Sequence, residues 1–403
     1  MKKSIFFLLL CVRTYAQDPC PEPEPCCKLD TDPKTEYRQR ITLKTTQGDG
    51  IGFDEGYSSL EAFLSHDLSR KLQDTLLIAD GRGHLFNNGL YAFNGGLGLR
   101  KFYPLKSLVF GGNAYYDYRK IHHGFFQQVG LGVEALWQYW TIRANGYIPI
   151  GPTARRKGSV KFDEFKGHKA LFKKPYEVDF YGADVEVGGT LFKKNWFELD
   201  GMLGGYYLTG KMHNQGGGGL ARVSLKMSSY VTLEGQTSYD NLFKWTGWGR
   251  FAFNYPFGKK ARVRCEPCCE KSGDLAARMA EPVSRFEIMP IHKTKKTAPA
   301  LDAKGDPLFF VFVDELSEED GDGSFEHPFN NLVEAENSSD LSDLIYVFEG
   351  EETTVTTPIL ESEPQILRSE SPHSFPTEFG PQTIPAQTES YYQLFYDGLS
   401  DYE

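Results

Sequence analysis

Apolar and polar residues alternate with a period of two through most of residues 37–258, in segments separated by turn-rich pieces such as FNNG, KKN and HNQGGGG. This period is typical of β-strands, in which successive side chains point to opposite faces. In residues 140–148 the apolar face holds Trp140, Ile142, Ala144, Gly146 and Ile148. In residues 231–239 it holds Val231, Leu233, Gly235, Thr237 and Tyr239. No window of this region has a strong helical pattern, so we expect it to be all-β.

The segment 110–119 shows what the two faces contain. Small and aromatic residues share one face: Phe110, Gly112, Ala114, Tyr116 and Tyr118. The opposite face holds Asn113, Tyr115, Asp117 and Arg119. An apolar face toward lipid and a polar face toward a lumen is the pattern of an outer-membrane β-barrel. We count about eleven or twelve such strands, and closure of an antiparallel barrel favours the even number.

The predicted fold class is therefore all-β, with an antiparallel transmembrane β-barrel of about twelve strands. A soluble β-sandwich or a lipocalin-like barrel also alternates, and it explains the apolar face equally well. It explains the charges on the opposite face less well, but a sandwich can leave charges in bulk water. Alternation alone therefore favours the membrane only modestly. The charged residues in question are Arg100, Asp117, Glu134, Arg143, Glu186, Arg222, Glu234 and Arg250.

Composition and the N-terminus narrow the class and the compartment. The net charge of −10 argues against a nucleic-acid-binding protein, which would need a basic face. Charge is uneven, because residues 155–174 are basic and residues 314–322 are acidic. Residues 1–16, MKKSIFFLLLCVRTYA, have the layout of a secretory signal peptide cleaved after Ala16, and a lipoprotein signal at Cys11 fits less well. No later segment holds eighteen consecutive apolar residues, so a membrane-spanning helix is not expected.

Several motifs in order resemble the inverse autotransporter β-domain of the intimin and invasin family. They are DEGYSSLEAFL, DGRGHLFNNGLYAFNGGLGLRKF, FGGNAYYDYR, QQVGLGVEAL, RANGYIPIG, DVEVGG, EGQTSYDNLF and NYPFG, which together extend over residues 37–258. The GGLGLR run is not a dinucleotide fingerprint, because no helical pattern follows it. The resemblance implies a Gram-negative outer-membrane barrel toward the N-terminus, with an extended linker in its pore and a C-terminal passenger at the cell surface.

The resemblance also assigns roles to the two faces. It implies that Tyr116 and Tyr118 meet lipid or the interfacial aromatic girdle. The candidate pore-lining residues are Asn113, Asp117, Arg119, Glu134, Arg143, Glu186, Arg222, Glu234 and Arg250. The chain departs from parts of the family in two respects: residues 17–36 are too short for a peptidoglycan-binding module, and no tandem immunoglobulin-like repeats are seen.

Residues 259–304 are expected to be the linker. The run DLAARMAE has a helical pattern with Ser272 or Asp274 as a cap and would stop at Pro282. Extended chain covers about 3.3 Å per residue, so roughly ten residues would span the height of the barrel through its pore. Arg278 and Arg285 are then expected to pair with acidic residues of the lumen. The alternative is a solvated interdomain linker.

Residues 305–403 are expected to be the passenger. The buried strands LFFVFV and LIYVFEG, separated by an acidic turn, resemble the entry to a right-handed parallel β-helix. The later pieces TTPILESEPQILRSESP and FGPQTIPAQTES fit further short rungs. Rungs of about 20–45 residues allow only a few in this length, and solenoids need caps, so we expect a passenger that is truncated or completed by a partner chain.

Six cysteines lie outside the signal peptide, three before the first predicted strand and three after the last: Cys20, Cys26, Cys27, Cys265, Cys268 and Cys269. In an even-stranded barrel both ends of the chain emerge on the same, periplasmic rim, which is an oxidising space. Disulfides within or between chains are therefore favoured, and about fifteen pairings are open. A zinc site is disfavoured because only one C-x-x-C occurs and no His lies nearby. Unpaired thiols are the remaining alternative.

Catalysis, cofactors and metals are not expected. The run EEDGDG at 318–323 resembles part of a calcium loop, but Phe329 stands where an EF-hand needs Glu, so a solvated turn is favoured. His122, His123 and His327 have no partners at metal or triad spacing, and no G-x-S-x-G, H-E-x-x-H or Walker loop occurs.

The sequence thus favours an outer-membrane inverse autotransporter that displays its passenger at the cell surface, for adhesion. The expected partners are outer-membrane lipid, the barrel-assembly machinery, periplasmic chaperones and a host-cell or surface receptor, with no nucleic acid. The first alternative is a channel or disulfide-crosslinked structural protein whose C-terminal region stays in the periplasm. A weaker alternative is a secreted polysaccharide-acting β-helix enzyme, which would need carboxylates clustered on one face. Exposure of the residues after 300 separates display from the channel.

Overall fold

The computed structural model describes residues 36–68, 75–103, 106–194, 196–261, 275, 278–317, 321–340, 343–348 and 365–387, with backbone only for 36–38 and 258–261. The predicted signal peptide, the N-terminal Cys/Pro-rich segment of residues 17–36 up to residue 35, and all the cysteines lie outside the described residues. No helix among the described residues is long and apolar enough to cross a membrane.

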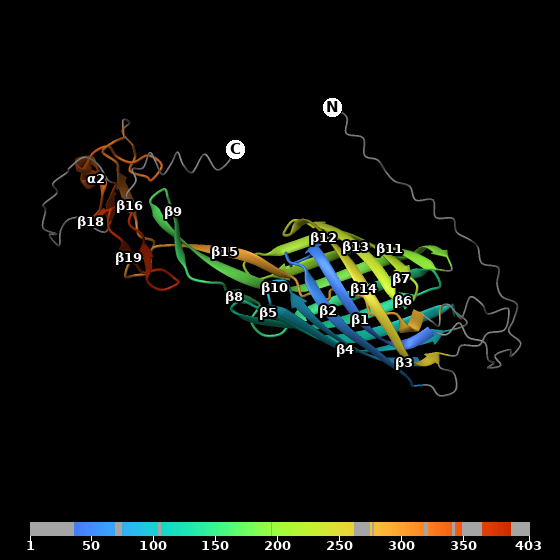
Figure 1. Ribbon diagram of the computed structural model, residues 1–403. Coiled ribbons are helices and arrows are strands. Elements are labelled where there is room, and N and C mark those ends of the chain that lie inside the picture. Colours follow the sequence, from blue (N-terminus) through green and yellow to red (C-terminus); the bar gives the residue numbers. More distant parts are fainter. Residues whose placement is uncertain are drawn as a thin grey trace, which may run out of the picture.

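Twelve antiparallel strands form a closed barrel, as predicted (Figure 1). Each strand pairs with its neighbour in the chain, β10 pairs with both β7 and β11, and β1 pairs with β14 to close the cylinder. The strands are β1 (Glu36–Asp49), β2 (Tyr57–Asp67), β3 (Thr75–Phe86), β4 (Tyr91–Tyr103), β5 (Leu108–Ile121), β6 (Gly124–Leu136), β7 (Trp140–Pro149), β10 (Lys169–Lys194), β11 (Phe197–Gly210), β12 (Gln215–Met227), β13 (Val231–Asp240) and β14 (Lys244–Ala261).

The two faces of the barrel wall differ as the alternation predicts. On β4, Leu97 is 63% exposed on the outside, whereas Asn94 and Arg100 are buried inside. Other exposed apolar residues continue this outer surface across neighbouring strands. Exposed aromatic residues lie near both ends of the strands: Tyr91, Tyr181, Tyr207, Tyr239 and Trp245 at one end, and Tyr103, Tyr139, Trp140, Trp196, Tyr230 and Tyr255 at the other. An apolar band between two aromatic girdles is the surface of a membrane barrel.

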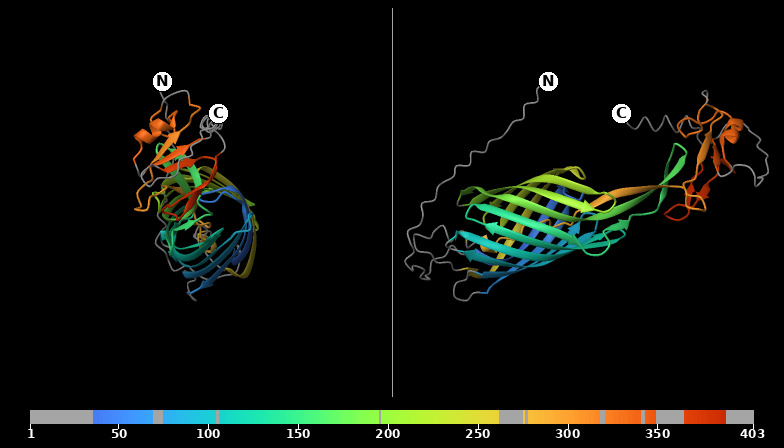
Figure 2. Two further views of the ribbon diagram at one scale, coloured as in Figure 1. Left: turned by 90° about the vertical axis from the view of Figure 1, so that its left-hand side faces the viewer. Right: turned by 180° about the vertical axis from the view of Figure 1, so that it is seen from behind.

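The two rims of the barrel are distinguished by what projects from them. We call the rim where β1 begins and β14 ends the terminal rim. From the opposite rim β10 continues beyond the barrel and pairs with β8 (Ala154–Arg156) and β9 (Lys161–Lys166), so we call this the hairpin rim. Figure 2 shows this long hairpin reaching away from the cylinder toward the C-terminal part of the chain.

The C-terminal part lies beyond the hairpin rim. Strand β15 (Ile291–Pro299) pairs antiparallel with the projecting half of β10. Three strands then form a parallel sheet, β16 (Phe310–Val313), β17 (Leu344–Val347) and β18 (Gln365–Arg368). Helix α2 (Leu332–Ser338) packs on this sheet and begins at Asn331, whose side chain accepts a hydrogen bond from the Glu334 amide at 2.9 Å.

One later segment differs from its prediction. Residues 382–384, within the piece FGPQTIPAQTES, form β20 (Gln382–Ile384), which pairs antiparallel with β19 (His373–Phe375) rather than adding a parallel rung. The turn at Thr377–Gly380 reverses the chain, with the Thr377 hydroxyl donating to the Gly380 carbonyl at 2.7 Å and Gly380 at φ +95°. A glycine with positive φ supports this tight reversal.

Candidate functional site

The lumen of the barrel contains a segment of the chain itself (Figure 2). Residues 275–291 enter at the terminal rim, where Leu275 and Met279 pack against wall residues, and reach the hairpin rim at Met289 and Ile291. The wall residues at the terminal rim are Phe63, Leu76, Ile78, Val109 and Leu136. We call residues 275–291 the lumen segment. Within the run DLAARMAE, Leu275 is helical and Arg278–Ala280 form a 3₁₀ turn, η3, while residues 274, 276 and 277 of the predicted helix lie outside the described residues.

Arginine side chains of the wall bind the backbone carbonyls of the lumen segment. Arg100 donates to the carbonyls of Met279 and Glu281 at 2.7 and 2.5 Å, and Arg40 donates to the Ala280 carbonyl. Farther along, Arg82 donates to the Val283 carbonyl at 2.7 Å. An extended chain needs partners for its backbone groups when it is buried. The wall supplies these partners through main-chain carbonyls, so the contacts do not depend on which side chains the lumen segment carries.

The central contact is the ion pair of Arg285 with Asp117 on β5. Two guanidinium nitrogens donate to the two carboxylate oxygens at 2.7 and 2.5 Å, and the side chains are 2% and 1% exposed. The guanidinium also lies over the rings of Tyr115 and Tyr147, at 4.4 and 5.3 Å from their centroids. This bidentate, stacked geometry is available to Arg and not to Lys.

Asp117 is held in place by a chain of buried polar side chains on the wall. Asn94 donates to Asp117 at 2.8 Å and Gln128 donates to it at 2.9 Å. The Asn94 carbonyl oxygen lies 2.7 Å from His84 Nε2, and His84 Nδ1 lies 2.7 Å from the Ser59 hydroxyl. These contacts orient the Asp117 carboxylate toward Arg285. Ser59 and His84 are themselves buried, and their geometry is that of a positioning network.

A second charged contact lies two residues farther along the lumen segment, at Glu287. Glu287 lies 2.8 Å from the Lys44 ammonium, 3.1 Å from Arg82 and 3.0 Å from Arg250. Three cations from β1, β3 and β14 therefore surround one carboxylate. Each cation also has a second acid on the wall, Glu61 for Lys44, Asp80 for Arg82 and Glu234 for Arg250. Loss of Glu287 would therefore remove one of two counter-charges from each of them.

Toward the hairpin rim the contacts become apolar again. Phe286 stacks on Tyr147 with centroids 5.4 Å apart, and its amide donates to the Tyr147 hydroxyl at 2.9 Å. Ile288 packs among Tyr57, Phe86 and Ala92, and Met289 packs with Ile121 and Phe126. At the exit, Arg119 donates to the carbonyls of Gly52 and Met289 at 2.8 and 2.5 Å. Apolar layers thus close both ends of a polar middle.

The nine candidate pore-lining residues are found on the inner wall, and most of them meet the lumen segment or one another. Asp117, Arg119 and Arg250 bind the lumen segment as described above, Arg143 pairs with Glu281 at 3.5 Å, and Arg222 donates to the Ser284 hydroxyl at 2.7 Å. Glu134 pairs with Arg100 at 2.6 Å, Glu186 pairs with Arg222, and Glu234 pairs with Arg250 at 3.2 Å. The side-chain amides of Asn113 and Asn145 both lie next to Gly132. That these residues line a conducting pore stays a prediction.

Two expectations for the lumen segment had different outcomes. Arg285 pairs with an acid of the wall, as expected. Arg278 also pairs with an acid in the lumen, but this acid is Glu281 of the lumen segment itself, at 2.8 Å, and Arg278 also donates to the Thr141 hydroxyl at 2.6 Å. The i,i+3 spacing on the 3₁₀ turn brings these two side chains together locally, and this competes with any acid across the lumen.

Several lumen residues were not singled out from the sequence. They are Lys44, Glu61, Asp80, Arg82, Tyr147 and Glu287. The period-two pattern carried a signal for the wall residues among them, because Asp80 and Arg82 occupy inward positions of β3. Glu287 had no such signal, since the lumen segment is neither strand nor helix.

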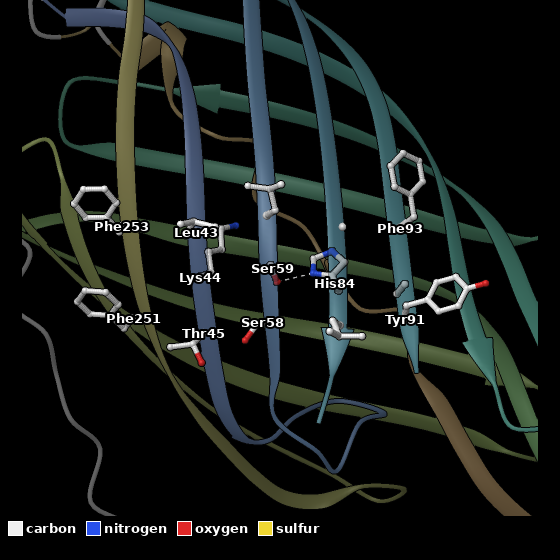
Figure 3. Close-up of a pocket in the computed structure, with 14 residues that line it drawn as sticks. Leu43, Lys44, Thr45, Ser58, Ser59, His84, Tyr91, Phe93, Phe251 and Phe253 are labelled. Atoms are coloured by element: carbon white, nitrogen blue, oxygen red, sulfur yellow. Dashed lines mark hydrogen bonds between the residues drawn. The ribbon is translucent and has the colours of Figure 1, made fainter. Parts of the chain in front are cut away.

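The hollow shown in Figure 3 belongs to the outer surface rather than to the lumen. It spans β14 and β1–β4, and its outward-facing walls are Leu43, Leu60, Leu85, Phe93, Phe251 and Phe253. The small residues Ser58 and Gly83 lie between these larger side chains and leave the surface hollow.

Among the described residues, no group of three or more His, Cys, Asp and Glu side chains is arranged to hold a metal. Asp322, from the run EEDGDG, accepts a hydrogen bond from Ser324, which lowers the pKa of its carboxyl; residues 318–320 of that run lie outside the described residues.

Comparison with known proteins agrees with the resemblance seen in the motifs. Residues 69–199 match the family model of the inverse autotransporter β-domain. No curated protein matches the chain. A solved structure from work on the in-meso crystallization of membrane proteins is 18% identical, with a TM-score of 0.45, over 63% of this chain and 100% of that one.

Two further solved structures are more distant. The COG4313 outer membrane channel from Pseudomonas putida F1 is 9% identical, with a TM-score of 0.37, over 58% of this chain and 100% of that one. The β-domain of the Bordetella autotransporter BrkA is 11% identical, with a TM-score of 0.27, over 54% of this chain and 98% of that one. Similarities this distant do not bear on function.

Proposed function

Because residues 69–199 match an inverse autotransporter β-domain and the chain forms an outer-membrane β-barrel, we propose that this barrel exports its own C-terminal passenger and displays it at the cell surface. The passenger is the part from residue 305 onward, and its role there is adhesion. In this proposal the barrel moves and holds a polypeptide and catalyses no chemical reaction. The partners of this proposal are outer-membrane lipid, the barrel-assembly machinery and periplasmic chaperones, and a host-cell or surface receptor for the passenger.

The observation that carries the proposal is the path of the lumen segment. The chain leaves β14 at the terminal rim, crosses the lumen as residues 275–291, and continues as β15 beyond the hairpin rim. The family's periplasmic rim is the one that holds both ends of the barrel, which here is the terminal rim. The passenger then lies on the opposite side of the membrane from the ends of the barrel.

The chemistry of the wall supports passage of a chain of any sequence. Arg40, Arg82 and Arg100 bind main-chain carbonyls, which every residue of a passing strand presents. Side-chain contacts that select a register come only from a few residues, chiefly Arg285 and Glu287. We infer that the wall holds passing segments weakly through their backbone, and that export halts when Arg285 reaches Asp117 and Glu287 reaches its three cations.

The packed lumen favours display over the channel alternative. Apolar residues close both ends of the lumen segment, and paired charges occupy the middle. An open channel would need this segment to leave, at the cost of unpaired charges on the wall. After export the segment remains as a plug, so the proposal needs no separate gate.

The test is protease shaving of intact cells that carry an epitope tag near residue 390. Display predicts that the tag is lost while the barrel band remains intact and heat-modifiable. A tag that is protected until the outer membrane is permeabilised would refute display and favour a periplasmic C-terminal region. A tag insertion in the turn at residues 228–230, at the terminal rim, serves as the protected control.

A further inference from the structure

The projecting β9–β10 hairpin forms part of the hydrophobic core of the passenger. Phe165, Ala170 and Phe172 are buried in one cluster with Phe310, Phe312, Leu344, Tyr346, Phe348, Leu367, Phe375 and Ile384. The first three residues come from the barrel's own extension, and the others come from the C-terminal part. A loop that only connects two barrel strands is normally polar and exposed. Three buried apolar side chains beyond the barrel therefore indicate a packing surface.

Phe165 is the centre of this shared core. It is 4% exposed, and its ring lies 4.9 Å from those of Phe312 and Tyr346 and 5.5 Å from that of Phe325. Each of these pairs joins the hairpin to the parallel sheet or to the turn that follows β16. The sheet is covered on its other face by α2, where Ala335 packs with Val311, Val313 and Ile345. The hairpin therefore covers the face of the sheet that α2 leaves open.

The tip of the hairpin also binds the backbone of the passenger. Phe325 donates to the Gly167 carbonyl at 3.0 Å, and Phe310 donates to the His168 carbonyl at 3.0 Å. The Gly167 amide donates to the Glu326 carboxylate at 2.9 Å, and the His168 ring stacks on Phe309 at 4.2 Å. One of these bonds, from the Phe310 amide, pairs a group on the edge of β16 that β17 leaves open, whereas the Phe312 amide on that edge donates to the Gly323 carbonyl at 2.9 Å.

The linker reaches this core by adding a strand to the hairpin. Nine residues of β15 pair with β10, from Ile291 opposite Asp179 to Pro299 opposite Leu171, and the next residue, Ala300, donates to the Ala170 carbonyl at 3.0 Å. The first residues past the lumen are therefore already ordered on the barrel. They deliver the passenger to the hairpin tip in a fixed register.

Charge favours docking of the acidic residues 305–403 on the hairpin, but it does not favour the pairing of β15, where Lys296 stands opposite Lys174. Residues 155–174 carry eight Lys and Arg against two Asp and Glu, a net of +6, and residues 305–403 carry one Arg against 23 Asp and Glu, a net of −22. Opposite charges of this size steer a chain toward its docking surface.

We propose that the β9–β10 hairpin is a built-in folding template for the passenger: it captures the emerging linker as β15 and then supplies the missing half of the core of the first rungs. This inference deepens the proposed function and rests on it. A small parallel sheet with an open face buries too little apolar surface to fold alone. On the template it folds as it emerges, and folding outside the membrane disfavours its return.

The test compares three variants of the full-length protein, Phe165→Ala, Phe165→Leu and Glu164→Ala. Glu164 is the neighbouring exposed residue of β9 and serves as the matched control. In detergent micelles we expect Phe165→Ala to shorten the trypsin half-life of the passenger about 100-fold, because cleavage follows the population of the opened state. Phe165→Leu should fall in between, and Glu164→Ala should match wild type. The heat-modifiable barrel band should be unchanged in all three.

A passenger of the Phe165→Ala variant that resists trypsin as long as that of Glu164→Ala would overturn the template. If Phe165→Ala yields no barrel band, the milder Phe165→Leu decides the question on the same scale. The surface tag on intact cells reports on the proposed function separately. A tag missing from the surface of wild-type cells refutes display, whereas a tag that is present with an unchanged trypsin half-life in the variants refutes the template alone.

Discussion

The contact of Arg285 with Asp117 is expected to decide whether the lumen stays closed, and Arg285→Ala tests it. The change removes two charge-assisted hydrogen bonds, at 2.7 and 2.5 Å, and leaves the Asp117 carboxylate buried without its cation. Removing one partner of a buried pair costs about 3–5 kcal/mol. Asn94 and Gln128 still donate to Asp117, so we expect the lower end of that range, about 3 kcal/mol.

This magnitude converts into an observable population. About 1.4 kcal/mol corresponds to a factor of ten, so the fraction of barrels whose lumen segment has left its site should rise about 100-fold. Single-channel recording in planar bilayers measures that fraction as the time spent in a conducting state. Lys295→Ala is the matched control, because it removes an exposed basic residue of β15 beyond the lumen.

The double variant Asp117→Asn/Arg285→Met sharpens the test. Removing both charges leaves no uncompensated ion, so the double variant should conduct less often than Arg285→Ala. The reasoning is refuted if Arg285→Ala conducts as rarely as wild type and as Lys295→Ala. It is also refuted if the double variant opens more often than the single one.

Three further results are expected. Gly52→Ala should increase channel openings, because residue 52 has φ +73° and an added Cβ would run into the backbone of the lumen segment at its exit; unchanged openings would contradict that contact. Leu97→Arg should cost the folded barrel about 2–4 kcal/mol in vesicles, measured by urea titration, because it places a charge on the apolar outer band, whereas Leu316→Arg on the exposed surface of the passenger should cost nothing measurable. The hydrogen bond from Lys293 lowers the pKa of Asp54, so this contact stabilises the exit at neutral pH and is lost as the pH falls through the lowered value. Both side chains are exposed, so Asp54→Asn should cost less than about 1 kcal/mol at pH 7 in the same titration, and a larger loss would be evidence against this assignment.

The barrel was predictable because its strands lie between lipid on the outside and a polar lumen on the inside, and this imposes the alternation of apolar and polar residues. Each strand must alternate between an apolar outside and a polar inside, so Leu97 and Asp117 reveal their faces from sequence position alone. The strand number followed from closure. The pairing of Arg285 with an acid of the wall was also predictable, since a buried Arg in a lumen needs a carboxylate.

The template was not predictable in the same way. Residues 155–174 stood out only as a basic segment, because lysines alternate there with Phe162, Phe165 and Phe172 and no local rule says what those rings bury against. Their partners lie more than a hundred residues away in the chain, at Phe310 and beyond. Local pattern cannot specify such a contact, because it depends on where the linker leaves the lumen.

The passenger shows the same limit on a smaller scale. The strands LFFVFV and LIYVFEG were identified by their apolar runs, and their residues Phe310–Val313 and Leu344–Val347 pair in parallel. The later piece around Thr383 is more polar, and it pairs antiparallel with β19 because the turn ending at Gly380 reverses the chain. A run of four apolar residues indicates a strand but not its direction.

The most direct test of the account measures which rim faces outward on intact cells. An epitope tag is inserted in the turn at residues 211–214 on the hairpin rim, in the turn at residues 228–230 on the terminal rim, or near residue 390 in the passenger. The account predicts that antibody binds the first and third tags on intact cells and reaches the second only after the outer membrane is permeabilised. Binding to the second tag on intact cells, with the third protected, would place the passenger in the periplasm and contradict the account.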